Sequence, residues 1–517
     1  MMRREYVNGS DHVSVRSGVA YGSGDMAFTF GTAITGFYLL IFLTNVVGLK
    51  GYMASGIIFF GFVWDAITDP IIGFHADRIR SKFGRRRILM LASAIPLGLS
   101  FFAVFALSTL ISRLTPGLLG LGNDQVQSVM WLKAFLVLII YLIFYLCYTL
   151  AYIPYISLIN DMTKSYRERT KLTGYRMVAT ILATIIAVAI PDIIMGDVTL
   201  THSGEKFILI SAIFGVAMVL IIIIAVLGTF EMPPNHKEST RKFRFYQDFL
   251  ECFKDRNFRK SALAFMCSLS AIFVLQDTIQ YYVNYWLLSP ELFLPLAGAV
   301  LVLGFLSVPL WVFISNRIGK RRTLYLGTLC WIIAFVTFYF LPQLPYREVA
   351  LDFSGERYIL PLTMGDAIQS FPIFGWLAVL ILGLGMGNIH LVAYGMYPDA
   401  ISILTQDHPE REGSYFGAVS FLQKVGIGLA TLLIGPILDL SGYQAKPSWE
   451  WFELLTASEL TIDPTWLYVQ SATSAQFAVK IAFCLMPIIM MIMAAVVVRG
   501  YRGDELLNQQ KGAPTLK

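Results

Sequence analysis

Long apolar stretches separated by short polar segments follow one another along the chain from residue 20 to residue 498. Each is long enough for a membrane helix, since a helix needs roughly 20 residues to cross ~30 Å of hydrocarbon. Hydrophobic residues make up 56% of the chain and charged residues 14%, which excludes a soluble protein of this length. The pattern therefore predicts an all-α membrane protein with twelve transmembrane helices. We expect them at residues 20–47, 52–76, 88–112, 130–158, 171–195, 207–230, 261–288, 293–316, 323–342, 373–398, 414–440 and 475–498.

The lysines and arginines predict the orientation of these helices, because both residue types accumulate on the cytoplasmic side of a membrane. With the N-terminus inside, the inner segments hold thirty of them when Lys171 at a helix end is included, the outer segments hold seven when Lys133 is included, and three lie deeper within predicted helices. Both termini are therefore predicted to be cytoplasmic, with tails at residues 1–19 and 499–517. The net charge of +6 follows from this topology and gives no reason to expect nucleic acid as a partner.

The longest inner segment, residues 231–260, divides the predicted helices six and six. We expect an N-terminal bundle at 20–230, a central cytoplasmic loop with a short helix on the membrane surface, and a C-terminal bundle at 261–498. A basic turn follows the second helix of each half, DRIRSKFGRRR from Asp77 and NRIGKRR from Asn316. A repeated half is typical of a two-bundle transporter. These charges either close a cytoplasmic gate or only fix the topology; the candidate gating residues are Asp77, Arg78, Arg85, Arg86, Arg317 and Arg321.

Other classes of function find little support in the residues. The chain has no nucleophile–base set, no ligand cluster for a catalytic metal and no phosphate-binding loop, so we do not expect an enzyme. The six histidines lack ligand spacing and the five cysteines avoid the outer segments, so we expect no cofactor, no resident metal and no disulfide. A channel is disfavoured because pores use repeated filter or ring elements. We expect a monomer that spans the plasma (inner) membrane many times, with the first helix directing its insertion.

Two carboxylates interrupt the second apolar stretch. Asp65 and Asp69 are one helical turn apart, and Thr68 lies on the same face. Pro70 lacks an N–H, so it leaves the carbonyl of Ala66 without its usual helical partner. An unpaired charge at this depth costs ~2.5 kcal/mol or more. The carboxylates therefore need a positive partner, which is a bound cation, a proton, or the side chain of Arg176 or Lys424.

These residues belong to a wider set of motifs. WDAITDPIIG is followed by a turn that ends in FGRRR, then by IPYISLINDMTKSYRERTKLTGYRMV, and late in the chain by YPDAIS, REGSYFGAVSFLQKVGIGLA and LDLSGY. The chain resembles the glycoside–pentoside–hexuronide:cation symporter family of the major facilitator superfamily, which includes the melibiose carrier; the vertebrate lysophospholipid carriers are relatives. The resemblance spans both halves and implies two six-helix bundles that move a substrate together with a cation.

The resemblance also implies a cation site. The two helix-2 aspartates of the family match Asp65 and Asp69, an intervening Asn of the family is Thr68 here, and a helix-4 Thr matches Thr149. The exchange of an amide for a hydroxyl leaves both Na⁺ and H⁺ open as the co-transported cation. The family's helix-5 Arg and helix-11 Lys, which lie near the central cavity, match Arg176 and Lys424.

The expected substrate site departs from that of the melibiose carrier. Its sugar-binding carboxylates fall at Thr29 and Tyr152, so its galactoside mode of binding is not expected. Aromatic and hydrogen-bonding faces on helices 1, 4 and 7 nevertheless suit a sugar or glycoside, and Arg176 with Lys424 would favour an anionic one such as a uronide. Helix packing explains the same side chains equally well. A lysolipid or other amphiphile is the alternative substrate, and a passive channel a distant one. The candidate substrate residues are Asp25, Thr29, Tyr148, Tyr152, Arg176, Asp277, Gln280 and Lys424, with Tyr155, Tyr281 and Asn284 on the same faces.

Overall fold

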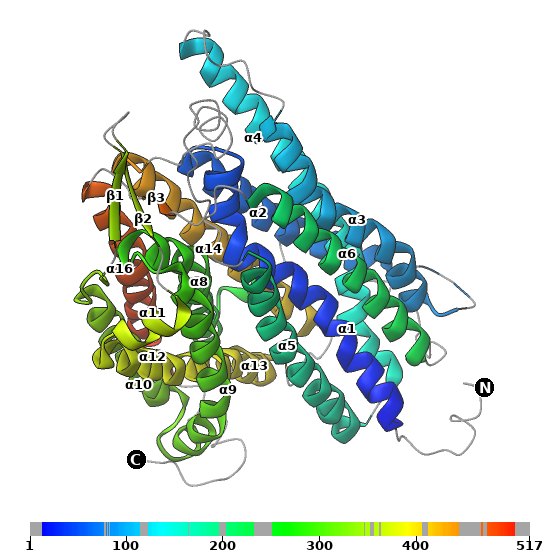
Figure 1. Cartoon of the computed structure of the whole chain (residues 1–517). Helices are drawn as coiled ribbons and strands as arrows, with labels where there is room; N and C mark the ends of the chain where they lie inside the picture. The colour runs from blue at the N-terminus through cyan, green and yellow to red at the C-terminus, as the bar shows by residue number, and fades with distance from the viewer. Residues whose placement is uncertain are drawn as a thin grey trace. The chain divides into compact units, whose positions relative to one another are not determined.

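The computed structural model describes most of the chain (Figure 1). The described residues are 13–76, 79, 81, 83–113, 123–163, 165–195, 203–231, 251–345, 347–351, 356–360, 363–405, 412–443, 467–468 and 473–501. Asp77 and Arg78, two candidate gating residues, lie outside them, as does most of the central segment in which a surface helix is expected.

The chain folds into two compact units. The first unit contains residues 1–35, 67–194 and 203–242, and the second contains residues 36–66, 195–202 and 243–517. The predicted division at the central loop into bundles at 20–230 and 261–498 stays a prediction.

The first unit is built from long helices that pack along their apolar faces. They are α1 (Val15–Ile34), α3 (Arg85–Arg113), α4 (Asn123–Met162), α5 (Tyr166–Met195), α6 (Ser203–Gly228) and the second part of α2 (Gly51–Ala76). Helix α3 packs on α4 and α6, and α1 packs on α6 (Figure 1). At the α3–α6 crossing Gly98 faces Gly215, where a Cβ on Gly98 would lie 2.5 Å from the carbonyl oxygen of Gly215. Glycine there lets the two backbones touch.

The second unit is also mainly helical. Its helices are α8 (Arg256–Tyr281), α9 (Phe293–Ile318), α10 (Lys320–Tyr339), α11 (Met364–Ser370), α12 (Ile373–Asn388), α13 (Tyr394–Leu404), α14 (Glu412–Leu440) and α16 (Thr473–Val497), with a 3₁₀ turn η6 (Pro290–Leu292) and a π-helical turn η7 (Ile389–Ala393). Helix α8 packs between α14 and α16, while α12 packs on α9 and α10.

A small antiparallel sheet is formed by residues of the segments 343–372 and 442–474, which lie between predicted membrane helices. Its strands are β1 (Arg347–Leu351), β2 (Glu356–Leu360) and β3 (Leu467–Tyr468), in the order β1-β2-β3. Val349 pairs with Tyr358, which also pairs with Tyr468. Segments about 110 residues apart in sequence thus meet, a non-local pairing that periodicity along the chain cannot predict.

Eleven helices in the described part of the chain are long and apolar enough to cross a membrane. Each corresponds to one of the twelve predicted stretches. The remaining stretch, residues 20–47, is α1 followed by two π-helical turns, η2 (Thr35–Leu39) and η3 (Phe42–Val46). The prediction of a nearly all-helical, multi-pass membrane protein is confirmed.

The internal repeat extends to the backbone hydrogen bonds of the first helix of each half. Helix α1 ends in η3, where the N–H of Val47 donates to the carbonyl of Phe42 at 3.0 Å. Helix α8 ends in the π-helical turn η5 (Tyr282–Trp286), where the N–H of Leu287 donates to the carbonyl of Tyr282 at 2.9 Å. In both, the next residue has a positive φ, +76° at Gly48 and +57° at Leu288. Leu288 thus adopts a conformation that ordinarily favours glycine.

Candidate functional site

In the first unit, Arg176 of α5 is ion-paired with Asp25 of α1. The Nη2 atom of Arg176 lies 3.1 Å from Oδ1 of Asp25, and the hydroxyl of Thr180 donates to the other carboxylate oxygen. The two helices approach closely because Gly22 faces Tyr175: a Cβ there would lie 2.7 Å from the Cβ of Tyr175. Both charged side chains are mostly buried, so each supplies the counter-charge that the other needs.

Aromatic rings of α1 and α4 surround this pair. The guanidinium of Arg176 lies 5.5 Å from the ring centroid of Tyr155, whose hydroxyl donates to the carbonyl of Tyr21 at 2.8 Å. Phe28 contacts the rings of Tyr148, Tyr152 and Tyr155 at centroid distances of 5.0–5.6 Å. The tyrosine face expected on helix 4 therefore packs on α1, and Thr29 follows Phe28 on that helix.

In the second unit, Lys424 of α14 is ion-paired with Asp65 of α2. Its Nζ atom lies 2.6 Å from Oδ2 of Asp65, and the exposed fractions of the two side chains are 15% and 5%. Asp65 therefore has a basic side chain as its positive partner, which is one of the alternatives that the sequence left open. Removing either partner of such a buried pair leaves an uncompensated charge, at a cost of ~3–5 kcal/mol.

The other residues of the expected cation site lie in the first unit. Thr68 and Asp69 follow Asp65 on α2 after three and four residues, as the sequence pattern predicted from helical spacing. Thr149 is fully buried on α4, where its hydroxyl donates to the carbonyl of Tyr145 at 2.9 Å. A single cation site formed by these four residues stays a prediction.

Two candidate substrate residues are buried on α8 in the second unit. Asp277 accepts a hydrogen bond from the hydroxyl of Thr431 on α14, at 2.7 Å from Oδ2. Gln280 follows on the next turn and is also buried. Further along the same face, the side-chain oxygen of Asn284 is buried and has no hydrogen-bond partner among the described residues.

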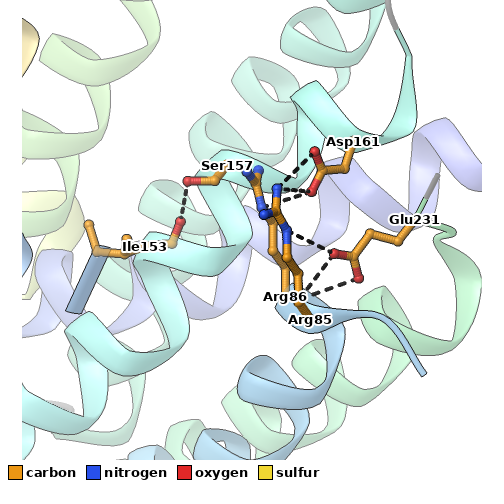
Figure 2. A network of polar contacts seen from close by, with 6 residues as sticks. All are labelled: Arg85, Arg86, Ile153, Ser157, Asp161 and Glu231. Carbon is orange, nitrogen blue, oxygen red and sulfur yellow. Dashed lines mark hydrogen bonds and ion pairs between the residues drawn. The ribbon is translucent and has the colours of Figure 1, made fainter. Parts of the chain in front are cut away.

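Two of the candidate gating residues, Arg85 and Arg86 at the start of α3, form a network in the first unit (Figure 2). Arg86 Nε lies 2.9 Å and Arg85 Nη2 3.2 Å from Oδ2 of Asp161, near the end of α4. Glu231, just beyond α6, accepts from the backbone N–H of Arg86 at 3.1 Å, so it caps the first turn of α3. Burial raises the pKa of the Glu231 carboxyl above its ordinary value.

The second unit has a corresponding contact at the start of α10. Lys320 donates to the carbonyl of Gly395 at 2.9 Å and is ion-paired with Asp399 of α13. The sequence pattern pointed to Arg317 and Arg321 instead. Arg317 lies over the ring of Phe313 at 4.1 Å, and Arg321 donates to the carbonyl of Tyr501 at 3.3 Å.

The acidic partners of these networks were not predicted from the sequence. Asp161 lies in SLINDM and Asp399 in YPDAIS, about 240 residues later, so each half carries one carboxylate beside its fourth helix. The internal repeat that relates the two basic turns also relates these two carboxylates, so the repeat is the signal in the sequence that points to them.

Comparison with known families decides the class of the protein. A family model described as MFS/sugar transport protein, where MFS stands for major facilitator superfamily, matches residues 20–505. The chain belongs to this family. The expected membership in a symporter family of the major facilitator superfamily is thereby confirmed, together with the integral, multi-pass membrane location.

Individual proteins are similar to this family member over most of its length. An uncharacterized symporter of Synechocystis sp. is 24% identical over 513 residues, which cover 83% of this chain and 86% of that protein. The sodium-dependent lysophosphatidylcholine symporter 1 of Xenopus tropicalis is 24% identical over 477 residues, covering 85% and 82%. A solved bacterial homologue of the human drug peptide transporters PepT1 and PepT2 has a TM-score of 0.58 at 10% identity, covering 97% and 100%. The last likeness shows the shared fold alone.

Proposed function

We propose that the protein is a secondary active transporter that moves its substrate together with Na⁺ or H⁺ by alternating access. The observation that carries the proposal is the ion pair between Lys424 and Asp65. A cation that reaches Asp65 takes over the role of Lys424 as counter-charge and releases the lysine. Cation binding thereby breaks a contact between α2 and α14. Coupling requires such a difference in interactions between the cation-bound and the cation-free states.

The cation would be held by oxygen atoms of Asp65, Thr68, Asp69 and Thr149. Hard cations prefer such ligands, and the carbonyl of Ala66, deprived of its helical partner by Pro70, adds another oxygen. The membrane potential supplies part of the drive: one charge moved through 100 mV is worth ~2.3 kcal/mol, which corresponds to roughly fifty-fold accumulation.

Uptake by the wild-type protein in proteoliposomes tests this proposal. An inward Na⁺ gradient and an inward H⁺ gradient, applied separately, should show which cation drives accumulation of substrate above its external concentration. A passive channel would equilibrate the substrate under every gradient and would not saturate. Accumulation that is the same with and without both gradients would refute cation coupling.

For the substrate, we propose a sugar or glycoside as first candidate. Buried polar groups that lack partners among the described residues support it: Nε of Arg176 can donate to a hydroxyl oxygen, and Oδ1 of Asn284 can accept from a hydroxyl group. The case for an anionic uronide is weaker than the sequence suggested. Arg176 and Lys424 are each matched by a carboxylate, so neither offers an uncompensated positive charge in this state.

A lysolipid-type amphiphile is the second candidate, favoured by the similarity to the lysophosphatidylcholine symporter. The packing of Phe28 on Tyr148, Tyr152 and Tyr155 also favours it, because those rings are engaged with one another instead of forming an open platform for a sugar. A thermal-shift screen against sugars, glucuronides and lysolipids, with and without Na⁺, decides between the two. A ligand at 100 times its Kd stabilises the folded protein by ~2.7 kcal/mol.

A further inference from the structure

Three basic residues lie deep within predicted membrane helices, and two of them, Arg176 and Lys424, are each paired with a carboxylate. The third, Lys480 of α16, instead places its ammonium group over two aromatic rings. Its Nζ atom lies 3.9 Å from the ring centroid of Trp286 and 4.4 Å from that of Tyr339. Lys480 therefore carries a positive charge that no carboxylate in the described part of the chain balances.

The two rings are held in place by hydrogen bonds around the end of α10. Trp286, in η5, donates from Nε1 to the carbonyl of Leu341 at 3.1 Å. The backbone N–H of Leu344 donates to the carbonyl of Leu287 at 3.3 Å, which ties the chain beyond α10 to the end of η5. Helix α16, which carries the lysine, packs on both α10 and η5. The lysine and the rings thus come from three elements that are joined to one another.

One helical turn from Trp286 and Lys480, the same elements form a tightly packed core. The ring of Tyr282 stacks on that of Phe483 at a centroid distance of 4.1 Å, and its hydroxyl donates to the carbonyl of Phe338 at 2.7 Å. All three of these side chains are buried. Because close-packed side chains keep their positions, the ammonium group is presented on a rigid surface, as a binding site requires.

Large apolar side chains next to the rings are exposed. Phe340 follows Tyr339 and is 74% exposed. Phe477 is 45% exposed, and its ring centroid lies 6.3 Å from that of Tyr339. Phe477 precedes Lys480 by three residues on α16, so the two lie on the same side of that helix. Exposed apolar side chains of this size mark a surface that contacts lipid in a membrane protein. Lys480 therefore lies beside such a surface.

The position of these residues along their elements indicates the level of the lipid head groups. Tyr339 is the last residue of α10 and Trp286 the last of η5, and Lys480 lies within two turns of the start of α16. All three are thus near one end of the second unit, which the charge distribution predicts to be the outer end. Tryptophan and tyrosine are enriched at the membrane–water interface, and a lysine near a helix end extends its ammonium group towards it.

We propose that Lys480, Trp286 and Tyr339 form a binding site for the phosphate group of an anionic phospholipid, such as phosphatidylglycerol. The rings hold the ammonium group by cation–π attraction, and its N–H groups donate to phosphate oxygens. The acyl chains lie against Phe340 and Phe477. A lipid with a net negative charge supplies the counter-charge that Lys480 lacks in the described chain, so it is favoured over a zwitterionic lipid.

A lipid titration of the purified protein tests the site. Native mass spectrometry in detergent counts the lipid molecules bound as phosphatidylglycerol or phosphatidylethanolamine is added. The wild type should bind phosphatidylglycerol more tightly than phosphatidylethanolamine. Lys480→Gln should weaken the binding of phosphatidylglycerol about fivefold, the usual share of one lysine in attraction to an anionic lipid. Wild-type affinity in Lys480→Gln would overturn the proposal.

Two further variants separate the site from general effects of charge and folding. Lys50→Gln is the matched control, because Lys50 is an exposed lysine of the same unit, just before α2, in a segment that is also predicted to be outer. It should keep the wild-type affinity, and so should Lys480→Arg, which retains the charge and can stack on the same rings. Equal weakening in Lys50→Gln and Lys480→Gln would overturn the proposal, since it would show attraction without a site.

Thermal unfolding distinguishes a lipid head group from a free phosphate ion. Because a ligand stabilises the folded protein that binds it, phosphatidylglycerol should raise the melting temperature of the wild type and of Lys50→Gln more than that of Lys480→Gln. Stabilisation by inorganic phosphate that disappears in Lys480→Gln would assign the site to the free ion and overturn its assignment to lipid. These measurements use no gradient and no transported substrate, so their outcome is independent of the transport function proposed above.

Discussion

Two basic residues that fall within predicted membrane helices, Arg176 and Lys424, are each paired with a carboxylate in the structure. The sequence could predict that such charges need partners, because burial of an isolated charge is costly. It could not predict the pairing itself. Asp25, Asp65 and Asp277 were all available to Arg176 and Lys424, and their distances depend on how the helices pack.

Lys424→Gln tests the competition between the lysine and a cation for Asp65. Lys424→Gln removes the ion pair that Lys424 forms with the buried Asp65, so we expect the cation-free protein to lose ~3–5 kcal/mol of stability. Added cation should restore more stability in this variant than in the wild type. Thermal unfolding as a function of Na⁺ concentration and of pH measures both effects.

Lys480→Gln is the control, since Lys480 lies over the rings of Trp286 and Tyr339 and is engaged with no carboxylate in the structure described. An identical cation response in Lys424→Gln and the wild type would argue against the competition.

The pair between Arg176 and Asp25 calls for a double-mutant cycle. Asp25→Asn leaves the guanidinium without its counter-charge, and Arg176→Gln leaves the carboxylate without its own. The double variant should therefore lose less stability than the sum of the two single losses. We expect a coupling free energy of ~1–3 kcal/mol from chemical unfolding in detergent. Additive effects of the two changes would show that the ion pair contributes nothing specific.

At the scale of elements, the apolar pattern predicted the membrane helices well because each helix must satisfy its own backbone and cover its length with apolar side chains. It did not predict the π-helical turns that end α1 and α8, since a one-residue change in hydrogen bonding leaves the hydropathy pattern unaltered. It also missed the caps made across helices, by Glu231 on α3 and by Asp439 on α2. These carboxylates are remote in sequence from the helix starts that they cap.

The cap made by Glu231 predicts a pH effect. Burial raises the pKa of this carboxyl above its ordinary value of 4.5, so the folded state binds its proton more tightly than the unfolded state does. The contribution of Glu231 to the free energy of unfolding should therefore fall as the pH rises from about 4.5 through the raised pKa. Glu231→Gln should remove this part of the pH dependence. The melting temperatures of wild type and variant, compared between pH 4 and pH 8 by ~0.5-unit steps, measure it. Parallel curves would contradict the assignment.

At the scale of the whole molecule, the two halves repeat one another in more than hydropathy. In each half, a basic residue at the start of the third helix is ion-paired with a carboxylate near the end of the fourth helix. A π-helical turn ends the first helix of each half. The family membership explains the repeat, since such transporters are built from related bundles. The candidate substrate residues are where the repeat breaks: Asp25 and Arg176 form a charged pair in the first unit, and Asp277 in the second binds a hydroxyl.

The most direct test of the central claim compares accumulation with exchange in proteoliposomes that contain Asp65→Asn or Asp69→Asn. If a cation at these carboxylates couples its gradient to the substrate, either variant should exchange internal for external substrate but fail to concentrate it. Asp192→Asn, which changes a half-buried carboxylate near the end of α5, should still concentrate it. Gradient-driven accumulation at the wild-type level in Asp65→Asn and Asp69→Asn would contradict the account.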